Sequence, residues 1–182
     1  MASTTTKLMT FAEFEQLPNA AEGLRQELRH GELVQVPPAK WIHFLLQDRL
    51  RGLLQDRAGG TGKAAIEFGF RPLSDNEYRI ADVAFASIER WKSTNPDGYF
   101  RGAPEIVIEV LSPSNTVTEM LDKEKLCLEN GCQEFWIVDP TLRLVKVSTP
   151  AGRAVTYSAG QEIPLLFGGS LAVDAIFTPA EG

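Results

Sequence analysis

Two acidic residues interrupt two of the most apolar stretches of this 182-residue chain. Asp82 lies within the run IADVAF at 80–85, and Glu109 lies within IVIEVL at 106–111. Both runs are predicted β-strands, and a carboxylate in a buried strand is costly unless something pairs with it. Two carboxylates from neighbouring strands can hold Mg²⁺ or Mn²⁺ by oxygen coordination, which would satisfy both of them.

Such a site has the parts for hydrolysing a phosphodiester. A bound cation acidifies water and offsets charge in the transition state. A lysine close to the cation can orient the water or stabilise developing charge. Lys123 and Lys125 follow on the helix predicted after the Glu109 strand, with Lys125 as the second candidate. The backbone carbonyl of Val110 is a candidate for a further oxygen ligand.

Each of these residues also has a purely structural interpretation. Asp82 can cap a strand or pair with Arg79, and Glu109 can point to solvent. The two lysines can be ordinary solvated positions on an amphipathic helix, because structural ion pairs also bury charge. The joint occurrence of two acids in two apolar strands favours a functional site.

The elements that must position these residues are centred on 104–140. The apolar strand ends at the turn formers of 112–115, and a helix is expected over 117–130, ended by Gly131. A second apolar strand follows at 135–138. A strand, a helix and a strand at this spacing predict a right-handed parallel crossover.

The remaining elements are predicted around this unit. A capping-box pattern begins a short helix after Thr10, and a hairpin is expected over 26–36. An amphipathic helix is predicted over 41–57, with an apolar face that includes Ile42, Leu45 and Leu50. Paired strands are expected at 64–72 and 79–86, and antiparallel strands at 142–148 and 154–157. Together these elements indicate an α/β core with a mixed sheet.

Composition indicates an ordinary globular chain, with 43% hydrophobic and 23% charged residues. We expect a single domain over 1–182, with 1–9 flexible. No apolar run is long enough for a membrane helix and no signal peptide is recognised, so a cytoplasmic location is expected. The net charge of −6 argues against binding nucleic acid by bulk charge. Cys127 and Cys132 fit no metal motif and are expected in the core.

The stretches 80–85, 104–114 and 131–140, among them IEVLSPS and EFWIVDP, resemble the Uma-two family. That family groups restriction-endonuclease-like proteins of the PD-(D/E)XK fold and was formerly a domain of unknown function. The resemblance runs from Phe11 to the terminal strands. It implies a nuclease fold, a divalent cation and DNA as the substrate.

The resemblance also implies roles for individual residues. Asp82 and Glu109 match the two metal-binding acids. Leu111 stands where the usual motif has lysine, and Lys123 matches a lysine that many relatives carry on the following helix. Glu27 matches an acid that precedes the core, and His43 matches a histidine expected to pack or to support the site. Cys127 replaces a tyrosine common in relatives.

Three functions are compatible with the sequence. The first is a Mg²⁺-dependent or Mn²⁺-dependent DNA endonuclease using Asp82, Glu109, Lys123 and Glu27. The second is an inactive binding or regulatory module of the same fold, as a homodimer, for which the acidic pI and Leu111 argue. The third is a structural homodimer; the apolar tail at 163–167 is compatible both with its interface and with the core.

Overall fold

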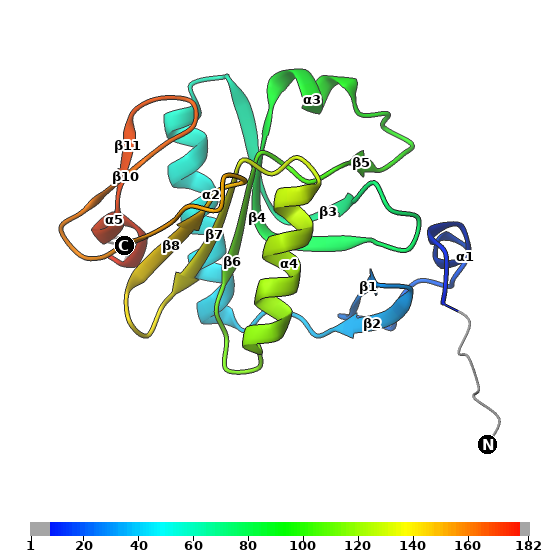
Figure 1. Cartoon of the computed structure of the whole chain (residues 1–182). Coiled ribbons are helices and arrows are strands. Elements are labelled where there is room, and N and C mark those ends of the chain that lie inside the picture. Colours follow the sequence, from blue (N-terminus) through cyan, green and yellow to red (C-terminus); the bar gives the residue numbers. More distant parts are fainter. Residues whose placement is uncertain (1–7, 179–182) are drawn as a thin grey trace.

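The computed structural model describes residues 8–178 and is organised around a seven-stranded sheet (Figure 1). The strand order is β5-β3-β4-β6-β7-β8-β9. The bounds are β3 Gly62–Arg71, β4 Arg79–Ser87, β5 Phe100–Arg101, β6 Ile106–Val110, β7 Glu134–Asp139, β8 Leu144–Ser148 and β9 Ala154–Tyr157. The expected flexibility of residues 1–9 falls mostly on residues 1–7, which lie outside the described part of the chain.

The centre of the sheet is the predicted crossover. Strand β6 pairs in parallel with β7, and the helix α4 (Val117–Glu129) connects them. A capping box between Thr116 and Glu119 begins α4. Its end is followed by Gly131 at a φ of 108°, a backbone conformation that a glycine adopts without strain. The neighbouring pairs β4–β6, β7–β8 and β8–β9 are antiparallel, so the sheet is mixed as predicted.

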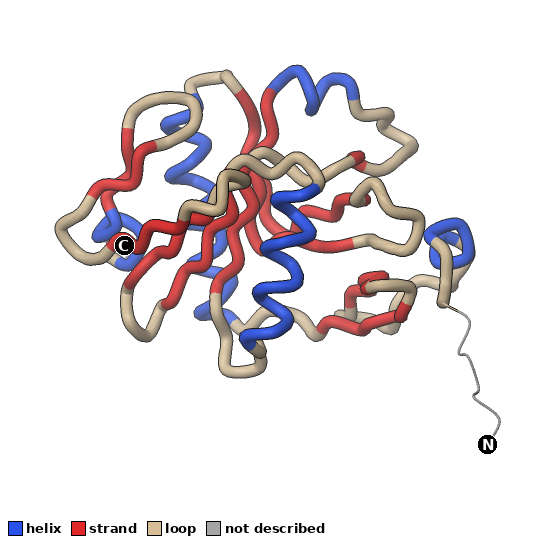
Figure 2. The backbone as a smooth tube through the Cα atoms, viewed as in Figure 1, coloured by secondary structure: helices blue, strands red, loops and turns tan. Residues whose placement is uncertain are grey.

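Helices cover both faces of this sheet, with α4 in front and α2 (Trp41–Ala58) behind it in Figure 1. Two small antiparallel hairpins lie apart from the sheet, β1 with β2 and β10 with β11 (Figure 2). The bounds of these and the remaining elements are α1 Phe11–Glu15, β1 Arg25–Arg29, β2 Glu32–Val36, α3 Ile88–Ser93, β10 Glu162–Pro164, β11 Ser170–Ala172 and α5 Val173–Phe177.

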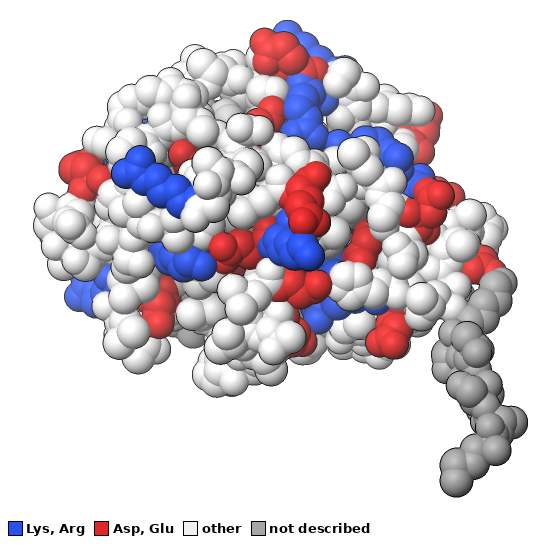
Figure 3. Space-filling model, viewed as in Figure 1, with Lys and Arg blue, Asp and Glu red and all other residues white. Residues whose placement is uncertain are grey.

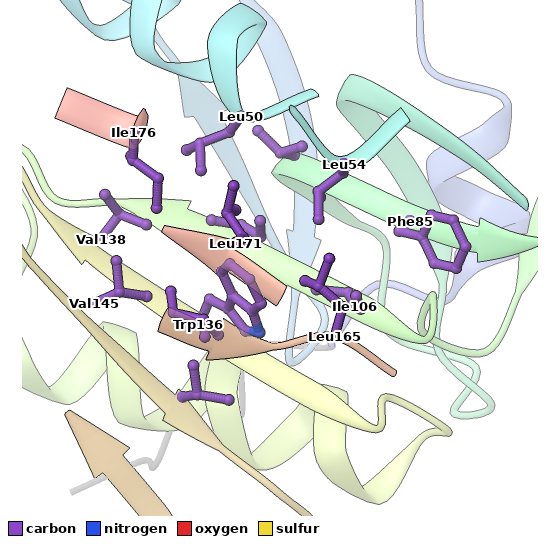
Figure 4. Packing of buried hydrophobic residues seen from close by; sticks show 14 of the residues in the cluster. Leu50, Leu54, Phe85, Ile106, Trp136, Val138, Val145, Leu165, Leu171 and Ile176 are labelled. Atoms are coloured by element: carbon purple, nitrogen blue, oxygen red, sulfur yellow. The ribbon is translucent and has the colours of Figure 1, made fainter. Parts of the chain in front are cut away.

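The larger core lies between α2, the sheet and the C-terminal segment (Figure 4). Leu50 and Leu54 of α2 pack there with Ile106 and Trp136. A second apolar cluster contains Val107, Phe135 and the two buried cysteines. The expectation that both cysteines are core residues is therefore confirmed.

One sequence expectation needs correction. Ile42 and Leu45 do not join the core face of α2; the Ile42 side chain is 74% exposed, because the first turns of the helix border a cleft. Of the two alternatives for the apolar tail, the structure favours the core, since Ile163 and Leu165 are buried while Leu166 is exposed. Association as a homodimer stays a prediction.

Candidate active site

The two acids lie where β4 and β6 separate. The regular pairing of these strands runs from Phe85↔Ile106 to Val83↔Ile108. Beyond that point side chains take over the hydrogen bonding. The Asp82 N–H donates to Glu109 Oε1 at 3.3 Å, and the Val110 N–H donates to Asp82 Oδ2 at 2.8 Å. Each carboxylate is thus held against the neighbouring strand, where the sheet opens.

Lys123 of α4 reaches the same point. Its Nζ lies 2.8 Å from Glu109 Oε2 and donates to the Ile80 carbonyl at 2.7 Å. The side chains of Lys123 and Glu109 are each 8% exposed. Lys125, in contrast, is 75% exposed and lies 4.0 Å from Glu129, one turn along the helix. Of the two candidate lysines, the structure brings only Lys123 to the acids.

Glu27 of β1 joins this group from the side of the small hairpin. Its buried carboxylate accepts the Ile80 N–H at 2.7 Å and pairs with Arg29 Nε at 2.6 Å. Burial opposes ionisation, but Lys123 and Arg29 outweigh it and hold the pKa of Glu27 below its usual value. Ile80 links Glu27 to the site, because its N–H serves Glu27 and its carbonyl serves Lys123.

Helix α2 supports Asp82 from the opposite face of the sheet. His43 Nε2 lies 3.1 Å from Asp82 Oδ2, and Gln47 Nε2 donates to Asp82 Oδ1 at 2.9 Å. The sequence predicts a packing or supporting role for His43 but does not single out Gln47. The spacing carries a signal for Gln47, because residues three or four apart on a helix share a face and Gln47 lies on the same stripe as His43 and the buried Leu50.

The structure contradicts most of the structural alternatives for these residues, although Asp82 does accept the Val110 N–H, as a residue that caps a strand would. Arg79 pairs with Glu77 at 2.7 Å and with Asp122 at 3.0 Å rather than with Asp82. Glu109 is buried and does not point to solvent. Lys123 is buried too, although it lies on a helix whose other lysine is solvated.

The surroundings shift the pKa values of the two acids in opposite directions. Burial raises the pKa of Glu109 to about 7, although Lys123 opposes the shift. Burial also acts on Asp82, but the His43 contact and the nearby Lys123 hold its pKa below the usual value. The same acids outweigh the burial of Lys123 and raise its pKa, so its amine is an ammonium ion. The hydrogen bond to Asp82 raises the pKa of His43.

These groups line one cleft of about 1430 Å³. Its walls come from the β1–β2 hairpin, the start of α2, the loop at 111–115 and α4. Glu27, Asp82, Glu109 and Lys123 all border it. This volume exceeds the about 300–1,000 Å³ that is usual for small-molecule pockets and so leaves room for a larger substrate.

The donor set suits a hard cation with few protein ligands. Within residues 8–178, no three His, Cys, Asp or Glu side chains converge to hold an ion by themselves. Two carboxylates at an open cleft still fit Mg²⁺, because this ion keeps several waters and binds through one or two carboxylates together with phosphate oxygens of the substrate.

The central mixed sheet, with its parallel β6–α4–β7 unit, is a restriction-endonuclease-like nuclease fold. It is similar to the crystal structure of "a putative nuclease belonging to DUF820" from Anabaena variabilis ATCC 29413. The TM-score is 0.79 at 22% identity, over 93% of this chain and 97% of the other.

The family model Uma2, described as "Putative restriction endonuclease", matches residues 11–174. The chain therefore belongs to the Uma2 family, as the resemblance in sequence implied. No curated protein matches the chain. Among the described residues, no helix combines the length and the apolar character needed to cross a bilayer.

Proposed function

We propose that this protein is a divalent-metal-dependent nuclease that hydrolyses phosphodiester bonds of DNA, acting as a single domain. The observation that supports it most is the convergence of Asp82, Glu109 and Lys123 at the open end of β4 and β6, in a chain of a nuclease family. Three charged groups buried together are costly for folding, which argues that they are retained for chemistry.

In this proposal Asp82, Glu109 and the carbonyl of Val110 hold Mg²⁺ or Mn²⁺. The cation would supply an acidified water and a positive charge beside the scissile phosphate. Lys123 orients the water and stabilises charge that develops on the phosphate; because it is protonated, it acts as a donor and not as a base. Glu27 assists by holding Ile80 and the ammonium of Lys123 in place. His43 and Gln47 orient Asp82.

The test is cleavage of plasmid and linear DNA by purified protein with Mg²⁺ or Mn²⁺, beside an Asp82→Ala variant and an EDTA control. We expect cleavage by the wild type alone, with a loss of at least about 100-fold in the variant. Calorimetry with Mn²⁺ should show binding to the wild type and none to Asp82→Ala. Equal cleavage by both proteins would indicate a contaminant and remove the proposal.

A second pair of variants assigns the lysine. Lys123→Met should lower the cleavage rate by about 100-fold, because the removed ammonium lies next to Glu109. Lys125→Met should leave the rate unchanged, since that side chain is exposed on the far side of the helix. A folded wild type that binds no Mn²⁺ and cuts no DNA would favour the inactive binding module instead.

A further inference from the structure

DNA must be held by a few fixed cations in this protein. Its net charge of −6 repels a polyanion at long range. On the face drawn in Figure 3, the coloured Lys and Arg side chains are interspersed with Asp and Glu and do not gather into one basic band. Affinity for phosphate therefore depends on which cations in the cleft still have donors to offer.

Three cations close to the acids are already used inside the protein. Lys123 serves Glu109 and the Ile80 carbonyl. Arg29 pairs with Glu27 and with Glu119, which lies 3.4 Å away. The Arg79 side chain is almost fully buried between Glu77 and Asp122. These groups stabilise the site more than they extend from it.

Arg25 differs from them. It begins β1, lines the cleft and is 26% exposed. One of its terminal nitrogens forms an ion pair with Glu67, and the other donates to the Pro37 carbonyl at 3.3 Å. A guanidinium carries five N–H donors in a rigid plane, so these two contacts fix its orientation and leave donors for a phosphate. Its charge also lies close enough to His43 to oppose, in part, the rise in the pKa of that imidazole that Asp82 causes.

Glu67, the anchor of Arg25, has an unusual backbone. Its φ is +52°, in the left-handed region that residues other than glycine rarely adopt, although it lies within the strand β3. The β3–β4 pairing omits it between Ile66↔Val83 and Phe68↔Ala81, so Glu67 lies opposite Asp82. Backbone strain of this kind clusters at functional sites.

Gln47 connects this anchor to the candidate metal ligand. It is fully buried, and its Nε2 donates at 2.9 Å both to Glu67 Oε1 and to Asp82 Oδ1. Its Oε1 has no partner, so the side chain is oriented by the two acids alone. A continuous chain of contacts thus runs from Asp82 through Gln47 and Glu67 to Arg25 on the cleft wall.

We propose that Arg25 binds a backbone phosphate of the DNA substrate, and that Glu67 and Gln47 are positioning residues that fix it relative to Asp82. This inference rests on the proposed nuclease function, whose acids it uses as the reference point. The contact between Arg25 and the phosphate forms with or without a metal ion.

Binding without metal tests it, because no cleavage is needed. Anisotropy of a fluorescein-labelled duplex of about 20 base pairs is measured in EDTA from about 50 to 200 mM salt. Arg25→Gln should weaken binding about tenfold and reduce the slope of log K against log salt by about 1. Arg25→Lys should keep the slope. Arg143→Gln is the matched control, since it removes the same charge at the Phe177 side of the cleft.

Glu67→Gln separates positioning from general electrostatics, because the two predict opposite signs. Removing a negative charge should tighten DNA binding if only the net charge matters. If Glu67 orients Arg25, the variant should instead bind about threefold more weakly, the scale of one ion pair. Circular dichroism confirms that each variant is folded.

The possible results distinguish a failure of the Arg25 contact from a failure of the proposed nuclease function. Equal effects of Arg25→Gln and Arg143→Gln on affinity and slope would overturn the inference while leaving metal-dependent cleavage intact. An Arg25-dependent slope in a protein that never cuts would support the phosphate contact and reject the nuclease. Tighter binding by Glu67→Gln would remove the positioning role. A wild type that binds no duplex would overturn the inference outright.

Discussion

Strand β6 is buried along its whole length but carries chemically opposite side chains on its two faces. Ile106, Ile108 and Val110 pack into the larger apolar core, whereas Glu109, which points to the other face, lies in a cluster of charges. Six of the seven buried polar or charged residues in the described chain belong to this cluster and its surroundings: Glu27, Gln47, Glu77, Arg79, Glu109 and Lys123. Burial on this strand therefore packs apolar side chains on one face and brings charged side chains together on the other.

The difference has an energetic consequence. Each apolar side chain in the core gains roughly 1.5–3 kcal/mol by leaving water. Buried ion pairs gain little net free energy, because desolvation offsets their attraction. We therefore expect the apolar core residues to determine whether the chain folds, and the buried charged residues to determine what the folded chain does. Three variants test this division, in order of decreasing effect.

The largest effect is expected in the core. Trp136→Ala should lower the free energy of unfolding by about 3–5 kcal/mol, because it empties the centre of the cluster in Figure 4. Denaturant titration measures it. Trp41→Ala is the matched control, as that ring is mostly exposed, and should stay within about 0.5 kcal/mol of wild type. Similar losses in both variants would contradict the placement of the core.

The second effect comes from Glu109 and depends on pH. Its pKa of about 7 lies above the ordinary 4.5, so its stabilising contribution is complete below pH 4.5 and is lost as pH rises to 7. Glu109→Gln cannot ionise. The free energy of unfolding of the variant, compared with that of wild type, should therefore rise by on the order of 3 kcal/mol between pH 4.5 and a pH above 7.

Unfolding curves of both proteins at several pH values measure this gain. Asp82 and Glu27, whose pKa values are lowered, act in another window: their contribution is lost only as pH falls below about 4. Parallel stability curves for wild type and Glu109→Gln between pH 4.5 and 7 would show that the Glu109 carboxyl is not shifted.

The smallest effect concerns the helix that delivers Lys123. Thr116→Ala removes the side chain that caps α4 and should cost about 1 kcal/mol. Thr118→Ala, two residues further along the exposed face, should cost nothing measurable, because alanine favours helix interiors. Thermal unfolding distinguishes them. If Thr116→Ala and Thr118→Ala had the same stability, the capping box would contribute nothing to the stability of α4.

Much of this arrangement is predictable from the sequence, because it depends on local patterns. The apolar runs identify β4, β6 and β7, and the acids inside them mark the site. Gly131 and Thr116 delimit α4. The parallel β6–β7 pairing follows from the spacing alone.

The remaining features depend on tertiary contacts. Nothing local predicts that Glu67 adopts a left-handed conformation opposite Asp82, or that Gln47 bridges the two. Leu45 fits a core pattern in the sequence but lines the cleft in the structure. Lys123 and Lys125 look alike in sequence, and only the packing of α4 separates them.

The two buried cysteines can serve as probes of local opening in this protein. Cys127 lies one turn after Lys123 on α4, and Cys132 follows the helix; burial raises the pKa of both, that of Cys132 to about 12. Because both side chains are buried, neither sulfur can react with an alkylating reagent until the packing around it opens. The rate at which Cys127 is labelled in native buffer therefore reports how often the part of α4 next to Lys123 opens.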